Sequence, residues 1–296
     1  MLIKKTAKDT LTPIEMDHGD TLAFICADGR EVALTLLETG GDVMVTELPS
    51  FDAPVSGAKT VCRFFCVVEV NGKRHCLERE VPTQKSFYEP WEIEGIQIWF
   101  DGVSDIFKSD GGFFDEKDAG GGIFCKPNHK ARFAIQDAAL EICPEKLHPW
   151  FPLPEGGLKI EDCYRGEDCW MGPYDGMLTH GGLDVNHPAG TPLWAPFDLD
   201  DQFYFNSVAQ GDLNNRWRGI RQWENGAKWI IQAHHMTSLT VRENTALKRG
   251  EQFANGAGVY SGVVDHTHFV FKIEEDGCTY FLDPWILIWK MYKDRS

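Results

Sequence analysis

Apolar and polar positions alternate through much of the first 140 residues, a pattern that predicts short β-strands. Two alternating runs flank Asp28-Gly29, and two more flank Asn71-Gly72; both dipeptides favour tight hairpin turns. The stretches 93–100 (IEGIQIWF) and 130–138 (KARFAIQDA) alternate in the way that half-buried strands do. Short strands joined by such turns are typical of a β-sandwich, so we expect residues 1–140 to form a β-sandwich-like accessory domain.

The segment 141–157 (EICPEKLHPWFPLPEGG) interrupts this pattern with four prolines and two glycines, and it predicts a linker. Strand patterns resume in residues 158–296, which we expect to form a second β domain. A helical pattern occurs only near the end, at 284–293 (PWILIWKMYK), where it predicts a short C-terminal helix. The sequence therefore predicts an all-β protein of two domains.

Charge and hydropathy limit the kinds of partner. The 296 residues carry a formal net charge of −16, which argues against nucleic acid, because nucleic-acid binding depends on basic residues that neutralise phosphates. No apolar run reaches the roughly 18 to 20 residues that a membrane span requires. The N-terminus lacks the apolar stretch of an export signal, and the sequence leaves the compartment open.

The cysteine pattern argues against a cysteine-based zinc ribbon. The chain has nine cysteines, but no two of them are spaced as a CxxC pair. Cys163 and Cys169 flank a glycine-containing loop and could form a disulfide in an oxidising compartment.

The stretch 180–190 (HGGLDVNHPAG) holds the first candidate metal ligands. In a straight strand, His180 and Asp184 would lie about 13 Å apart, too far to share one ion. Gly181-Gly182 between them would permit a bend that brings the two side chains together. On its own, this pair fits either half of a metal site or a polar turn.

A second histidine pair lies in the strand-like stretch 265–273 (DHTHFVFKI). Alternation places His266 and His268 on one face, which suits one metal ligand and one neighbour that acts on metal-bound water. His180, Asp184 and His268 would supply three ligands and leave a fourth position open, as in catalytic zinc sites. A cupin-like site is disfavoured because cupins place their HxH motif before the other ligands. The adjacent His234 and His235 would face opposite ways on a strand, so we expect only one of them to reach a site.

Three motifs in this order resemble those of the lysostaphin-like (LytM-type) zinc metallopeptidases. HGGLDVNHPAGTPLWAPFD is similar to that family's HxGxD segment, which continues into GTPVxAPxDG. AHHMTSLTVRENTALKRGEQF is similar to its YxHLSxxxVxxGxxVxxGQ segment, with His235 in the place of the HL histidine. DHTHFVFKI is similar to its PHLHFEV segment, and FLDPW to a short closing element. The resemblance covers about residues 150–290 and leaves the first half unmatched.

The resemblance implies a two-sheet β domain with a groove across one sheet. It implies Zn²⁺ held by His180, Asp184 and His268, with His235 and His266 as the catalytic pair that orients or deprotonates the zinc-bound water. It further implies an endopeptidase that hydrolyses peptide bonds of bacterial cell-wall peptidoglycan, and a periplasmic or extracellular location.

The sequence departs from the family pattern beside the predicted site. The glycine after APxD is missing, and Gln232 or Ala233 replaces the tyrosine of YxHL. The net charge of −16 is also unusual for an enzyme that attacks an often anionic polymer. Two alternatives to the peptidoglycan endopeptidase therefore stay open: a non-enzymatic LytM-like module that binds or regulates cell-wall machinery, and a zinc hydrolase with another peptide substrate.

Overall fold

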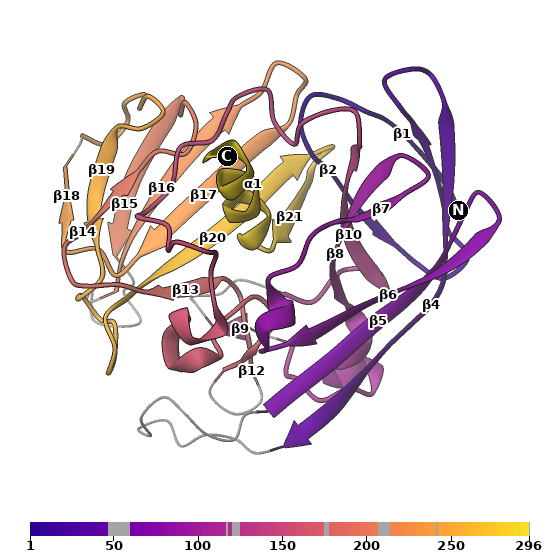
Figure 1. Cartoon of the computed structure of the whole chain (residues 1–296), viewed down its shortest axis with the longest axis horizontal. Coiled ribbons are helices and arrows are strands. Elements are labelled where there is room, and N and C mark those ends of the chain that lie inside the picture. The colour runs from indigo at the N-terminus through magenta and orange to yellow at the C-terminus, as the bar shows by residue number, and fades with distance from the viewer. Residues whose placement is uncertain are drawn as a thin grey trace.

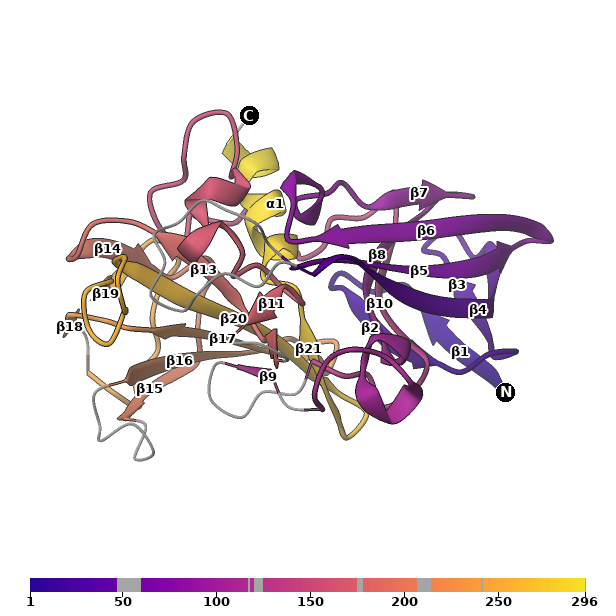
Figure 2. The ribbon, with the colours of Figure 1, turned by 90° about the horizontal axis from the view of Figure 1, so that it is seen from below.

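The protein is all-β, as the sequence predicts, apart from short 3-10 turns and one C-terminal helix. The structure is a computed structural model that describes residues 1–46, 60–116, 118–119, 125–174, 178–206, 214–240 and 242–295. In two views at right angles, the strands of the first half lie on one side of the molecule and those of the second half on the other (Figures 1 and 2).

The first half contains two facing sheets. One sheet has five strands, in the order β1 (Leu2–Thr6), β3 (Thr21–Ile25), β4 (Glu31–Thr46), β5 (Thr60–Val70) and β6 (Lys73–Val81). The other has four, in the order β2 (Thr12–Met16), β10 (Ala131–Asp137), β8 (Ile96–Val103) and β7 (Trp91–Ile93). The rings of Phe64 and Phe100, one from each sheet, meet at 5.4 Å between centroids, as expected for a sandwich core.

Both predicted hairpins are confirmed. β3 pairs antiparallel with β4 around Asp28-Gly29, and β5 pairs with β6 around Asn71-Gly72. Asn71 and Gly72 have φ values of 47° and 81°, the left-handed conformation that a two-residue hairpin turn of this kind requires.

The expectation of a half-buried strand at 130–138 is wrong, because every residue of β10 is buried. Its sheet is covered on both faces. On the face opposite the sandwich, Arg132 forms a buried ion pair with Asp101, and its guanidinium lies 5.7 Å from the ring of Trp170. Charged positions in the sequence pattern therefore mark a buried ion pair here and not a solvent-exposed face.

The second half is built on one large sheet and two small ones. The large sheet has the order β13 (Leu183–Asn186), β20 (His266–Glu275), β17 (Lys228–His234), β16 (Asn215–Gln222) and β15 (Asp201–Asn206), with β21 (Cys278–Leu282) paired to the far end of β20. One small sheet has the order β14 (Thr191–Trp194), β19 (Gln252–Gly256) and β18 (Ser238–Leu239). The other joins β11 (Pro173–Tyr174) and β12 (Leu178–His180) to β9 (Asp118–Ala119), a short strand from the first half of the chain. Trp217 of the large sheet stacks on Phe253 at 3.7 Å between ring centroids, so β16 packs against β19.

The predicted C-terminal helix is confirmed as α1 (Trp285–Arg295), which lies between the two halves (Figures 1 and 2). Trp289 contacts Trp99 of the sandwich at 5.5 Å between ring centroids. No helix of the described residues is long and apolar enough to cross a membrane.

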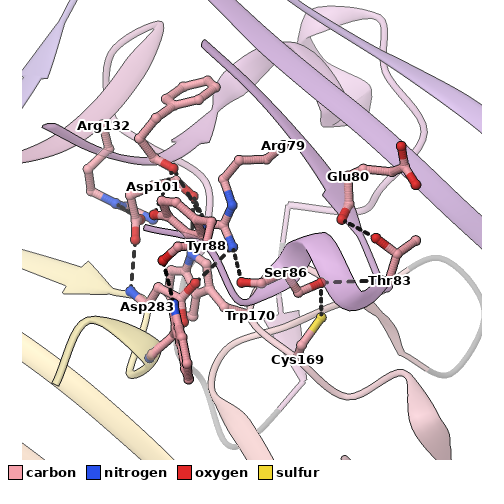
Figure 3. Close-up of polar contacts among 12 residues, drawn as sticks. Arg79, Glu80, Thr83, Ser86, Tyr88, Asp101, Arg132, Cys169, Trp170 and Asp283 are labelled. Atoms are coloured by element: carbon pink, nitrogen blue, oxygen red, sulfur yellow. Dashed lines mark hydrogen bonds and ion pairs between the residues drawn. The ribbon is translucent and has the colours of Figure 1, made fainter. Parts of the chain in front are cut away.

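A buried ion-pair network joins the two halves immediately before α1 (Figure 3). Arg79 of β6 donates to the Asp283 carboxylate at 2.8 Å, and both side chains are at most 2% exposed. The backbone N–H of Asp283 donates to Asp101, which also accepts from Arg132 Nε at 2.7 Å. The guanidinium of Arg79 also lies 4.3 Å from the ring of Tyr88. Burial and the nearby Asp101 carboxylate raise the pKa of Asp283 to about 6 despite the Arg79 charge.

The segment 141–157, expected to be a linker, is packed against the second half. Trp150 is fully buried and lies 4.7 Å from the ring of Phe269, and the Tyr292 hydroxyl of α1 donates to the carbonyl of Pro154. The division of the chain into 1–140 and 158–296 stays a prediction, but residues on both sides of it share one buried core.

We predict that Arg79→Met destabilises the protein strongly, because it leaves the Asp283 carboxylate buried beside Asp101 without its cation. The free energy of unfolding should fall by about 3–5 kcal/mol in denaturant titrations. Lys73→Met, which breaks the exposed ion pair with Glu94, is the matched control and should leave the unfolding midpoint nearly unchanged. Equal effects of the two substitutions would contradict the role given to the buried pair.

Candidate metal centre

Strand pairing places Asp184 directly opposite His268. β13 runs antiparallel to β20, and in their register Asp184 faces His268 and Asn186 faces His266. Both histidines lie on the face of the large sheet that carries Asp184, as the HxH spacing predicts.

A bend at Gly182 brings His180 to the same point. His180 ends β12, and its Nε2 atom lies 3.2 Å from Asp184 Oδ1 although four residues separate them. A Cβ atom on residue 182 would lie 2.5 Å from Cε1 of His268, closer than real Cβ atoms approach. Glycine is therefore required here for the space that the His268 ring and the backbone oxygen of Phe269 occupy.

The three candidate ligand atoms form a compact triangle. His268 Nδ1 lies 2.6 Å from Asp184 Oδ1 and 3.0 Å from His180 Nε2, and the third side of the triangle measures 3.2 Å. Ligand atoms at about 2.0–2.1 Å from a tetrahedral ion lie roughly 3.3 Å from one another. Two imidazole nitrogens and one carboxylate oxygen at this spacing fit a divalent metal ion, so the three residues form a candidate metal site.

Burial and neighbouring charges shift the pKa values of the groups in this site. Desolvation would raise the pKa of the Asp184 carboxyl, but His180, His266 and His268 outweigh it and hold the pKa well below its ordinary value. Burial lowers the pKa of His268 although Asp184 opposes the shift. The site therefore pairs an ionised carboxylate with a neutral imidazole, the protonation states in which these groups bind a metal.

His266 differs from the other histidines in its charge. Burial acts to lower its pKa, but the Asp184 carboxylate, whose Oδ2 lies 3.2 Å from His266 Nε2, raises the pKa above its ordinary value. Its Nδ1 lies 2.9 Å from the carbonyl of Val264, to which it donates when protonated there. Nε2 thus faces the candidate metal site and is the nitrogen able to hold or release a proton there.

Both His234 and His235 reach the site, so the expectation that only one would do so is wrong. His234 lies on the metal-side face of β17, with its ring centroid 4.6 Å from that of His268. His235 has a φ of 66°, which breaks the strand alternation and places its ring 4.7 Å from that of His266. Burial lowers the pKa of both histidines well below the ordinary value.

His187 lies outside the centre. Its Nε2 atom is 2.7 Å from the hydroxyl of Thr267, whose side chain lies on the opposite face of β20 from His266 and His268.

Two further residues lie beside the site, and neither belongs to the predicted metal ligands or the predicted catalytic pair. The Tyr164 ring packs on the His266 ring at 4.2 Å between centroids, and its hydroxyl accepts from the N–H of Val263 at 3.2 Å. Asp168 is fully buried; burial and the nearby Asp184 raise its pKa well above the ordinary value although His180 opposes the shift. An aromatic residue shortly before HGGLD is the signal that could have indicated Tyr164, whereas Asp168 is one acidic residue among several.

All five residues that the sequence singles out therefore lie in one cluster. His180, Asp184 and His268 are at most 3% exposed, and His235 and His266 at most 8%. Their roles as ligands or catalytic groups stay predictions.

Comparison with known proteins yields distant structural matches only. No protein-family model matches the chain, and no curated protein matches its sequence. Among solved structures, the chain is similar to lysostaphin from Staphylococcus simulans, with 19% identity over 50% of this chain and 51% of that one, and a TM-score of 0.33. The chain thus spans about half the length of that lysostaphin structure.

Two other matches extend over most of this chain. A putative peptidase M23 from Pseudomonas aeruginosa is 14% identical over 87% of this chain and 92% of its own, with a TM-score of 0.33. A zinc-containing peptidase from Vibrio cholerae is 9% identical over 92% and 84%, with a TM-score of 0.34. Superpositions of this quality do not establish a shared function, so the chemistry of the site has to decide what the protein does.

We predict that the protein binds about one divalent metal ion per chain through its three-ligand set. His180→Ala and Asp184→Ala should each abolish binding, measured by elemental analysis of protein purified without chelators. His187→Ala is the control, because this histidine lies on the other face of β20, and it should keep the metal. A metal content unchanged by both ligand substitutions would refute the assignment.

Gly182→Ala should also lose metal although it removes no ligand. The added methyl group would clash with the His268 ring and with the backbone oxygen of Phe269, so the metal content should fall although all three ligands are still present. Gly190→Ala, at a glycine with open space around it but a φ of 85°, controls for the general cost of substituting a glycine near the site and should keep the metal. Full metal content in Gly182→Ala would show that the ring has room to move.

Proposed function

We propose that the protein is a zinc-dependent endopeptidase that hydrolyses peptide bonds of bacterial cell-wall peptidoglycan. The observation that carries this proposal is the convergence of His180, Asp184 and His268 with two further histidines, His235 and His266, beside them. The order of the three motifs supports the choice of substrate, because it resembles that of the lysostaphin-like peptidases. A wall substrate would require the protein to act outside the cytoplasmic membrane.

The three ligand atoms would hold zinc, and the remaining coordination position would take water or the substrate carbonyl. When bound, zinc lowers the pKa of a coordinated water and polarises a peptide carbonyl. Asp184 has two tasks: Oδ1 belongs to the ligand triangle, and Oδ2 lies 3.2 Å from His266 Nε2.

His266 and His235 are suited to proton transfer and to stabilising negative charge. His266 is oriented by the Val264 carbonyl and has a raised pKa, so its Nε2 can take a proton from the attacking water and pass it to the leaving amine. Nδ1 of His235 is buried and has no hydrogen-bond partner among the described residues, and in the tautomer that carries the proton on Nδ1 it would donate to the oxygen of a tetrahedral intermediate.

A non-enzymatic module explains these features less well. A protein that only binds wall components has no need of a complete ligand set with two further histidines beside it. The near-complete burial of the cluster does imply a movement before turnover. Tyr164, whose ring lies 4.2 Å from that of His266 between centroids, is itself buried beside the cluster.

We predict that His235→Ala and His266→Ala keep their zinc and lose turnover by roughly 10²- to 10⁴-fold, the range of general acid–base contributions. Digestion of purified peptidoglycan, followed by identification of the cleaved bond, measures the activity. His268→Ala should lose both metal and activity, and His187→Ala should keep both. Release of the same fragments at the same rate by the His268→Ala protein would exclude the proposed chemistry.

A further inference from the structure

The metal-side face of the large sheet continues beyond the histidines into a cationic patch. In the strand register, Arg216 of β16 lies opposite His234, and Arg218 lies opposite Gln232. On the next strand, Phe205 faces Arg216 and Phe203 faces Arg218. We call Phe203, Phe205, Arg218 and Gln232 the Arg218 patch; its members share the sheet face of the candidate metal ligands, since side chains two residues apart point the same way.

The guanidinium of Arg218 is held in one orientation by neutral groups. It lies 5.0 Å from the ring centroid of Phe203 and 5.5 Å from that of Phe205. With the amide of Gln232 turned so that its oxygen faces the arginine, that oxygen accepts from Nε at 2.8 Å and from Nη2 at 2.9 Å. A guanidinium has five N–H donors in a planar fork, so the edge formed by Nη1 and Nη2 keeps donors for a further acceptor.

This environment is unusual among the half-buried and buried arginines of the chain. Arg79, Arg132 and Arg221 each form an ion pair with at least one carboxylate. Arg218 forms no ion pair with any carboxylate of the described residues, although the chain has 45 acidic residues against 29 basic ones. Burial lowers the pKa of Arg218 although the charge of Glu274, which forms no ion pair with it, opposes the shift, so the guanidinium is partly desolvated without a paired anion.

A desolvated guanidinium with a preoriented fork is the arrangement that recognises a carboxylate bidentately. We propose that the Arg218 patch binds a carboxylate of the peptide substrate, and so selects peptides that carry a free carboxylate near the cleaved bond. This inference rests on the proposed function, because it takes the substrate to be a peptide bound across the sheet.

The sheet geometry fixes where that carboxylate lies. Across the sheet, Arg218 lies two strands away from β20. Along the strand direction, it lies two residues from the row that contains His268. Together these two offsets place Arg218 roughly 12 Å from the metal ligands. About three to four residues of extended peptide cover this distance. The selected carboxylate therefore belongs to a residue a few positions from the scissile bond and not to the bond itself.

Two peptides that differ in one charge test this subsite. The first is L-Ala-γ-D-Glu-L-Lys-D-Ala-D-Ala with an amidated C-terminus; in the second, the α-carboxylate of D-Glu is also an amide. The zinc-loaded protein should bind the first about 10- to 100-fold more tightly, the range of a charge-assisted hydrogen-bonded pair, in calorimetric titrations. kcat/KM should show the same preference wherever cleavage occurs.

Substitutions on β16 assign the preference to one side chain. Arg218→Gln should bind the two peptides equally, and Arg218→Lys should keep part of the preference because the charge stays but the fork is lost. Arg221→Gln is the matched control: it lies on the same strand and the opposite face, and it should keep the full preference. A preference that survives in Arg218→Gln, or none in the unsubstituted protein, would overturn the subsite.

Binding and cleavage separate the two proposals. Carboxylate-dependent binding that is lost in Arg218→Gln, without cleavage of peptide or peptidoglycan, would leave the subsite standing and refute the endopeptidase. Cleavage of both peptides at equal kcat/KM would refute the subsite and leave the endopeptidase standing.

Discussion

The buried pair of Arg79 and Asp283 is the constraint on which the rest of the molecule depends. A buried charge without a partner is strongly destabilising. The two halves of the chain must therefore lie so that the Arg79 guanidinium meets the Asp283 carboxylate. Asp283 directly follows β21, which pairs along the second half of β20. β20 in turn carries His266 and His268 at its other end. The position of the candidate metal centre is thus tied, through one continuous hydrogen-bonded sheet, to an ion pair made with the sandwich.

Local patterns made much of this fold predictable from the sequence. Hairpins at Asp28-Gly29 and Asn71-Gly72, the C-terminal helix and the HxH pair each depend on neighbouring residues, and the structure contains all of them. The expectation of a half-buried strand at β10 was wrong, because the groups that cover it, such as Trp170, come from distant parts of the chain. Arg79 and Asp283 are 204 residues apart, so no local pattern indicates that they meet.

The candidate site could be predicted where the spacing of residues along the chain determines which side chains meet. It could not be predicted where one backbone φ angle decides the direction of a side chain. The missing side chain of Gly182 leaves room for the His268 ring, which lies where a Cβ atom would be. Strand alternation allowed only one of His234 and His235 to reach the site; both do, because the left-handed φ of His235 reverses the direction that alternation assigns to its side chain. Asp168 escaped prediction because nothing in its neighbourhood distinguishes a buried acid from an exposed one.

The distribution of charge also bears on how a peptide would approach. The chain is strongly acidic, so its net charge of −16 disfavours the approach of an anionic polymer. Arg218 is partly exposed, while the candidate metal ligands are almost completely buried. A peptide carboxylate can therefore engage Arg218 before the scissile bond reaches the histidines.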